Sequence, residues 1–284
     1  MPINILCIGD VVGKPGRGLL ADNLRQFIDE RQVDLVVCNA ENAAGGSGLT
    51  GQILKKLLHY GVDVATLGDH AFKKLQIVSE MRTSDRVVRP ANLSLSAAGR
   101  GWTVVPTKSG LYRAAVIVLL GQTYMKSCDS PWQKADEVLS EVPAPVKIRV
   151  VDFHAEASSE KVAMGWHLNG RATVVFGTHT HVPTADARVL DGGTAYISDV
   201  GMTGPYDGVL GRRKDRVLYA LTTSMPAPFD VARGDPRLCA VLVSANPDTG
   251  LAEGIERIEI AGKTVDGPIY DPEDAAGQGF YRNE

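Results

Sequence analysis

The sequence predicts an α/β fold whose first half is built on a largely parallel β-sheet. Within the first 70 residues, three short apolar runs at 4–8, 34–40 and 62–67 have the length and composition of buried strands. Segments with helical spacing of apolar residues alternate with these runs, and that alternation is typical of parallel α/β sheets. No change of composition marks a linker. We therefore expect one domain over residues 1–284, with a loosely held tail from about residue 262.

Local signals define the two helices expected between these strands. The first helix runs from about Pro15 to Arg31 and carries leucine, phenylalanine and isoleucine side chains at helical spacing. The second helix begins after Thr50, whose hydroxyl suits an N-cap, and it ends at Gly61. Each strand of this half therefore leads into a loop at its carboxyl end.

The remainder of the chain is richer in expected strands. We expect helices over 129–140 and 156–168, and in the second of these Val162, Ala163 and Trp166 have the spacing of a buried face. The other expected elements are a glycine-rich loop at 200–208 and strands at 87–88, 102–106, 114–120, 147–153, 172–176, 196–198, 238–244 and 255–260, the last two as an antiparallel pair.

Composition restricts the partners and the compartment. The formal net charge of −3 leaves no basic surplus for binding a long nucleic acid, although a local pocket for one phosphate is compatible with it. The four cysteines contain no Cys-x-x-Cys pair, and Cys7 and Cys38 lie in apolar runs, so we expect buried thiols without disulfides. The first residues lack the basic leader of a signal peptide, and no stretch approaches a membrane span. We expect a cytoplasmic protein; whether its chains form a homo-oligomer stays open.

A His-x-His pair follows the apolar run at 172–176. If the backbone stays extended past that strand, the side chains of His179 and His181 point to the same side. Neutral imidazole is a common nitrogen ligand of metals, so two such rings at a strand end indicate a metal site.

Other predicted strands also end in groups that can bind metal. Carboxyl ends of parallel strands share one edge of an α/β sheet, where ligands bind, so we expect these side chains to converge. Oxygen and nitrogen donors without sulfur suit two ions of the manganese, iron or zinc kind, held about 3.5–4 Å apart. One acid would bridge the ions, and a histidine outside their coordination could protonate a leaving alkoxide. The strand-end residues are Asp10, Glu41, Asn42, Asp69, His70, His154, His179 and His181.

Six sequence blocks in a fixed order resemble the YmdB-like metallophosphoesterases. The resemblance covers residues 3 to about 260, and six ordered blocks are far more specific than one motif. The blocks are Gly9-Asp10-Val11-Val12-Gly13, Asn39-Ala40-Glu41-Asn42-Ala43-Ala44, Val88-Arg89-Pro90-Ala91-Asn92, Asp152-Phe153-His154-Ala155-Glu156-Ala157, Gly177-Thr178-His179-Thr180-His181-Val182 and Asp199-Val200-Gly201-Met202-Thr203-Gly204-Pro205.

The resemblance implies a four-layer α/β/β/α sandwich with a dinuclear iron or manganese centre. It also implies hydrolysis of small phosphodiesters, notably 2′,3′-cyclic and 3′,5′-cyclic nucleotides, by in-line attack of a metal-bridging hydroxide on phosphorus. His70 would be the acid beside the leaving group. The implied ligands are Asp10, Glu41, Asn42 and His181 for one metal, and Asp69, His154 and His179, with Glu41 as the bridge, for the other.

One position departs from the family pattern. The family usually has Gly-Asn-His where this chain has Gly68-Asp69-His70. The additional negative charge should bind the ions more tightly and make them weaker Lewis acids. It therefore motivates a second hypothesis, a regulatory protein that binds metal and nucleotide but turns over slowly. An amidohydrolase barrel fits poorly, because His-x-His tends to lie near the first strand of that fold.

Several of these residues have simpler explanations. His70 could orient a neighbour by a hydrogen bond instead of acting as an acid, and Asn42 could form a turn. The 200–208 loop could line a substrate pocket or be a tight structural turn. Lys14, Arg17 and Arg171 could steer a phosphate, although exposed basic residues usually have no such role.

Overall fold

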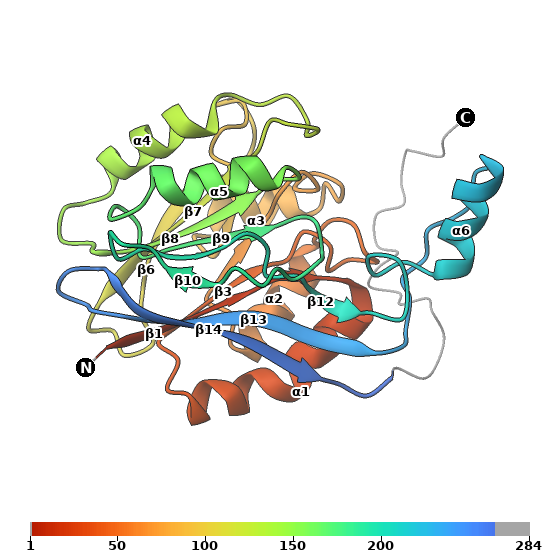
Figure 1. The fold of residues 1–284 in the computed structure, drawn as a ribbon, viewed down its shortest axis with the longest axis horizontal. Coiled ribbons are helices and arrows are strands. Elements are labelled where there is room, and N and C mark those ends of the chain that lie inside the picture. Colours follow the sequence, from red (N-terminus) through yellow and green to blue (C-terminus); the bar gives the residue numbers. More distant parts are fainter. Residues whose placement is uncertain (1, 265–284) are drawn as a thin grey trace.

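The computed structural model describes residues 2–264, which fold into two β-sheets packed face to face between two layers of helices (Figure 1). The first sheet has the order β2-β12-β13-β1-β3-β4-β5, and β14 also pairs with β13. Its strands are β1 (Ile3–Ile8), β2 (Asp10–Val11), β3 (Leu35–Asn39), β4 (Val64–Thr66), β5 (Val87–Val88), β12 (Met202–Pro205), β13 (Pro236–Ala245) and β14 (Ala252–Ala261).

The second sheet has the order β10-β11-β9-β8-β7-β6 and is parallel from β11 to β7. In the first sheet, β1, β3, β4 and β5 are also parallel, as the strand–helix alternation predicted. The strands of the second sheet are β6 (Trp102–Pro106), β7 (Arg113–Leu120), β8 (Ile148–His154), β9 (Val174–Thr178), β10 (Arg188–Val189) and β11 (Ala195–Ile197).

Three apolar interfaces separate the four layers, and period-two alternation in the strands produces them. On β1, Ile3, Ile5 and Cys7 face the second sheet, whereas Leu6 and Ile8 face the helices on the other side. The strands β3, β7 and β8 alternate in the same way, so the central strands of both sheets are buried on both faces. This arrangement confirms the predicted α/β class and the layered sandwich.

Helices cover the two outer faces. Helices α1, α2 and α3 pack on the first sheet, and α4 and α5 pack on the second (Figure 1). Thr50 caps α2 by accepting a hydrogen bond from the Ile53 amide at 3.3 Å, and Gly61 ends that helix at φ 117°, as the sequence predicted. The helices are α1 (Gly13–Glu30), α2 (Gly51–Tyr60), α3 (Ile77–Thr83), α4 (Pro131–Glu141), α5 (Ser158–His167) and α6 (Lys214–Thr223).

Four short or marginal elements were absent from the sequence prediction: β2, β10, α3 and α6. Helix α6 projects away from the sheets and buries only Val217 among its described residues, so no clean apolar stripe marks it (Figure 1). The predicted loop at 200–208 is wrong in part. It contains β12, which pairs with β2 and β13 and is fully buried although glycine and proline make up half of it.

The predicted buried face of α5 is also wrong. Val162, Ala163 and Trp166 are exposed, and the helix instead buries Lys161 and Met164, together with Gly165. Relative to the predicted orientation, the helix is rotated about its own axis, because the ammonium of Lys161 has an ionic partner inside the protein.

Two further sequence expectations concern the chain as a whole. The tail expected from about residue 262 lies outside the described residues except for 262–264. Across residues 2–264, none of the helices combines the length and the apolar character needed to cross a membrane.

Candidate metal centre

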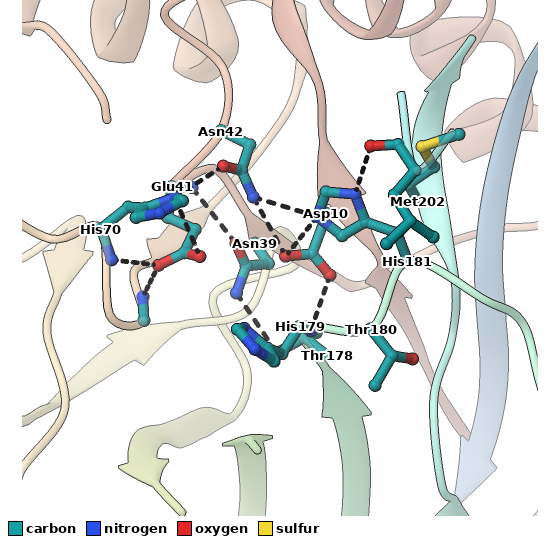
Figure 2. A network of polar contacts seen from close by, with 12 residues as sticks. Asp10, Asn39, Glu41, Asn42, His70, Thr178, His179, Thr180, His181 and Met202 are labelled. Carbon is teal, nitrogen blue, oxygen red and sulfur yellow. Dashed lines mark hydrogen bonds and ion pairs between the residues drawn. The ribbon is translucent and has the colours of Figure 1, made fainter. Parts of the chain in front are cut away.

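The structure brings all of the sequence-predicted site residues to one edge, where the carboxyl ends of the two sheets meet. Figure 2 labels all of them except Asp69 and His154. The first sheet supplies the carboxylates, the amide and one imidazole, and the second sheet supplies three imidazoles. The residues are Asp10, Glu41, Asn42, Asp69 and His70 from the first sheet, and His154, His179 and His181 from the second.

Four of these side chains form one tight cluster. One ligand atom each from Glu41, Asp69, His154 and His179 lies within 4.8 Å of all the others. His154 Nε2 is 3.0 Å from His179 Nδ1, 3.1 Å from Glu41 Oε1 and 3.3 Å from Asp69 Oδ1. Neighbouring ligands of an octahedral ion with bonds of about 2.1 Å lie about 3 Å apart, so these distances fit a metal.

Asp10, Asn42 and His181 form a second group beside this cluster, joined to it by the His179 amide, which donates to Asp10 Oδ2 at 3.1 Å. His181 Nε2 is 3.7 Å from Asp10 Oδ1 and 3.2 Å from Asn42 Nδ2. The carboxamide oxygen of Asn42 points to His70 Nδ1 at 2.8 Å, so the amide presents its nitrogen to this second group. A ligand role for Asn42 would require the two amide atoms to exchange places, and it stays a prediction.

Each of the three imidazoles from the second sheet has an outer nitrogen, which points away from the site, and an inner nitrogen, which points into it. A contact at the outer nitrogen holds each ring in place. His154 Nδ1 lies 2.9 Å from Thr178 Oγ1, whose own proton goes to Asp152 Oδ1 at 2.6 Å, so the hydroxyl must accept from the ring. His179 Nε2 lies 3.2 Å from the Glu156 carboxylate, and His181 Nδ1 lies 3.1 Å from the Leu210 carbonyl.

All three partners are acceptors, which fixes the proton on the outer nitrogen of each neutral ring. The inner nitrogens of His154 and His179 therefore carry lone pairs that point at each other and at carboxylates, whereas that of His181 faces the Asn42 amide nitrogen. Such an arrangement is repulsive unless a cation lies between them. The donor set thus fits bound metal ions.

The pKa shifts of His154 and Asp10 also indicate that positive charge is favoured at this site. Burial alone would lower the pKa of His154, but the carboxylates of Glu41 and Asp69 outweigh it and raise that pKa well above its usual range. Burial likewise opposes ionisation of Asp10, yet His181 and His154 hold the pKa of that carboxyl far below its usual value. The carboxylates therefore give the site a negative charge.

A buried polar network fixes the strand ends beneath the cluster. Asp152 accepts hydrogen bonds from the hydroxyls of Thr66 at 2.5 Å and Thr178 at 2.6 Å, and from Asn39 Nδ2 at 3.2 Å. Burial raises the pKa of Asp152 to about 6. The sequence prediction gave no role to these residues, although a polar residue inside an apolar strand run could have indicated a buried polar network.

The backbone reasoning behind the His-x-His prediction is wrong, although the residues are at the site. His179 and His181 have φ values of 99° and 65°, so the strand does not continue as an extended chain. The left-handed turns send the two rings to opposite sides of the site. Thr180 between them donates its hydroxyl to Asp199 Oδ2 at 2.8 Å, which anchors the loop.

Asp199 is in turn neutralised by a buried lysine. Lys161 Nζ lies 2.6 Å from Asp199 Oδ2, and the two side chains are only 3% and 1% exposed. Asp199 Oδ1 also accepts from the Gly201 amide at 2.8 Å. One carboxylate therefore joins the histidine loop, the chain leading into β12 and helix α5.

Close packing leaves no room for side chains at two positions beside the ligands. A Cβ at Gly68 would lie 2.3–2.4 Å from the His154 ring, and a Cβ at Gly177 would lie 1.7 Å from the Ser198 carbonyl oxygen. Gly68 also donates its amide to Glu41 Oε2 at 2.7 Å, which orients the carboxylate toward the ligand cluster.

His70 and Lys126 border the cluster on the solvent side. The side chain of His70 is 27% exposed, and its Nε2 lies 3.7 Å from Asp69 Oδ2. Lys126 Nζ lies 3.5 Å from the same oxygen and also donates to the backbone carbonyl of Asp69. The additional charge at position 69 therefore has a cationic partner that sequence reasoning did not find.

The basic residues considered for steering a phosphate do not gather at the site. Arg17 is buried and donates to the Ala43 carbonyl, which makes it a support for the turn after β3. Arg171 lies before β9, at the opposite end of that strand from the histidines. Lys14 is an exposed residue in the first turn of α1.

A two-sheet sandwich with carboxylates and imidazoles converging at the carboxyl ends of its strands defines the class of metallophosphoesterase folds. Comparison with known proteins narrows this class. The family model described as YmdB-like protein matches residues 6–258, so the chain belongs to the YmdB-like family.

Individual relatives match this protein in sequence or structure over nearly the whole chain. It is 43% identical over 258 residues to the 2′,3′-cyclic-nucleotide 2′-phosphodiesterase of Bacillus subtilis, covering 91% of this chain and 97% of that protein. The crystal structure of a hypothetical protein from Thermus thermophilus matches with a TM-score of 0.86 and 34% identity over 92% of this chain and 100% of that chain. A novel phosphatase from Mycoplasma pneumoniae matches with a TM-score of 0.85 and 33% identity over 92% and 94%.

Proposed function

We propose that this protein is a metal-dependent phosphodiesterase that hydrolyses cyclic nucleotides, with 2′,3′-cyclic monophosphates as its main substrates and 3′,5′-cyclic monophosphates as a second class. The convergence of three imidazoles with the carboxylates of Asp10, Glu41 and Asp69 carries the proposal. The 43% identity to a 2′,3′-cyclic-nucleotide 2′-phosphodiesterase supports the substrate class. Small phosphodiesters in the cytoplasm, and not long nucleic acids, are the proposed partners.

Two ions, iron or manganese, are proposed to occupy the centre. Glu41 is the proposed bridge; its Oε2 is held by the amides of Gly68 and His70 at 2.7 and 2.9 Å. Bound ions of this kind supply a nucleophile from water at neutral pH and neutralise charge on a phosphoryl group. The chain itself positions the donors and keeps their lone pairs free.

His70 is the proposed general acid. Its Nδ1 lies 2.8 Å from the Asn42 carboxamide oxygen, an acceptor, so this contact orients the ring. Nε2 is then the atom that would deliver a proton to the departing ribose oxygen. A general acid contributes about 10²–10⁴ in rate, and it matters most when the leaving group is a poor one.

The leaving group provides the test of this role. Full-length protein loaded with manganese should hydrolyse both 2′,3′-cyclic AMP and bis(p-nitrophenyl) phosphate. His70→Ala should slow the cyclic nucleotide by at least about a hundredfold but barely affect the p-nitrophenyl ester, whose leaving group needs no proton. Equal losses on both substrates would contradict the acid role and indicate a structural one.

The hydrolase assignment itself is tested at the metal ligands. His181→Ala should lose metal and activity together, whereas His59→Ala, an exposed histidine on α2, should retain both. A His181→Ala protein with full metal content and full rate would refute the assignment.

The charge at Asp69 favours a second candidate function, a regulatory protein that binds metal and nucleotide but turns over slowly. Lys126 and the ring of His70 both face Asp69 Oδ2, so the carboxylate remains charged at the site. Asp69→Asn separates the candidates. A large rate gain would support slow natural turnover, and rapid hydrolysis by both proteins would exclude it.

A further inference from the structure

A small basic cavity lies at the other end of the second sheet, away from the candidate metal centre. Its volume is about 120 Å³, and it is formed where β8 and β9 begin and where the hairpin loop between β13 and β14 meets them. Its lining includes Lys147, Arg149 and Arg171, together with the hairpin residues Thr249 and Gly250.

The hairpin loop is fastened rigidly against the second sheet at this point. Thr173 Oγ1 donates to the Gly250 carbonyl at 2.6 Å and accepts from the Arg149 amide at 2.9 Å. Gly250 has a φ of 77°, and a Cβ there would lie 2.1 Å from the Lys147 carbonyl oxygen. These contacts fix the position of the hairpin backbone against the second sheet.

The positive charge around the cavity is only partly compensated. Arg171 pairs with Asp136 at 2.6 Å, but within residues 2–264 neither Lys147 nor Arg149 forms an ion pair. Arg149 Nη1 donates to the Arg171 backbone carbonyl at 3.2 Å, whereas the Arg171 guanidinium donates to Asp136 and to the His167 carbonyl. Lys147 and Arg149 therefore line the cavity without a neutralising carboxylate among the described residues, and like charges of this kind are stabilised when an anion lies between them.

One buried donor of a residue that lines the cavity lacks a protein partner. Arg149 Nε is inaccessible to solvent and makes no hydrogen bond to any described residue. Buried donors are nearly always satisfied, so the guanidinium of Arg149 is incompletely bonded by the protein. A guanidinium with free N–H donors is suited to the oxygens of a phosphate.

The size of the cavity restricts the ligand. Pockets for drug-sized molecules have volumes of about 300–1,000 Å³, so 120 Å³ accommodates one small anionic group and not a whole nucleotide. The position of the cavity also restricts its function. Arg149 and His154 are five residues apart on β8, about 17 Å along the strand, so the cavity cannot hold a substrate of the metal centre.

We propose that this cavity binds a single phosphate group, supplied either by inorganic phosphate or by a mononucleotide whose nucleoside lies outside. Lys147 and Arg149 provide charge that no described carboxylate neutralises, and the guanidinium of Arg149 is incompletely bonded by the protein. The strands β8 and β9 connect this site directly to His154 and His179.

Isothermal titration of the full-length protein as purified tests the proposal, first with inorganic phosphate and then with adenosine 5′-monophosphate. Arg149→Gln and Lys147→Gln should each weaken one saturable binding event about tenfold or more, because each removes a charge-assisted hydrogen bond. Arg82→Gln, which removes the same charge from an exposed position on α3, should leave it unchanged.

The two ligands identify the source of the phosphate. Equal affinities would mean that the phosphate group alone is recognised, and tighter binding of the mononucleotide would mean that the nucleoside adds contacts. Absence of saturable binding, or binding that neither substitution weakens, would overturn the proposal. Lys147 is exposed, so its variant keeps the test valid if Arg149→Gln fails to fold. Neither residue belongs to the metal centre, so the outcome is independent of the phosphodiesterase assignment.

Discussion

The buried pair between Lys161 and Asp199 should stabilise both the fold and the metal centre. Lys161→Met removes the cation and leaves a carboxylate 1% exposed. Breaking one side of a buried ion pair costs about 3–5 kcal/mol. We expect the lower end, about 3 kcal/mol, because Asp199 keeps hydrogen bonds from Gly201 and from the amide and hydroxyl of Thr180.

Urea unfolding followed by circular dichroism measures this loss, and metal analysis of the same samples measures the effect on the centre. Lys214→Met is the matched control, because its Nζ lies 2.5 Å from Asp207, but the two side chains are 60% and 56% exposed. An exposed pair of that kind contributes at most about 1 kcal/mol. Equal stability losses in both variants, or Lys161→Met with wild-type stability and metal content, would refute the reasoning.

Three further perturbations have defined outcomes. Thr178→Val removes the acceptor of His154 Nδ1 while keeping the side-chain shape, and it should weaken metal binding about 10–100-fold in a competition titration with a chelator. Burial would raise the pKa of Asp186, but hydrogen bonds from Ser198 and Thr184 outweigh it and lower that pKa. The stability that this carboxylate adds is present above about pH 4 and lost as the pH falls through its lower folded pKa, so unfolding curves of Asp186→Asn should depend less on pH there. Removing bound metal with a chelator should lower the melting temperature, and re-addition should restore it.

The sequence was sufficient to predict the core strands and the residues at their ends. Runs such as 34–40 and 114–120 are almost entirely apolar because these strands are buried on both faces, and such runs are easily recognised. Because the strands are parallel, Asp10, Glu41 and Asp69 had to meet at one edge.

Tertiary contacts explain where the prediction was wrong. Helix α5 buries Lys161 because this side chain pairs with Asp199. The partner lies 38 residues further along the chain, so no local pattern contains that information. Likewise, the left-handed backbone at His179 and His181 depends on the anchoring of Thr180 by the same carboxylate. Strand β12 forms in a glycine-rich stretch because β2 and β13 supply its hydrogen bonds.

We propose that the imidazoles and carboxylates hold two metal ions, with His179 at one and His181 at the other. Metal-to-protein ratios of the manganese-loaded protein test it most directly. We predict about two ions per chain in the wild type and about one in each of His179→Ala and His181→Ala. A wild type that binds no metal, or two variants that both retain two ions, would contradict the account.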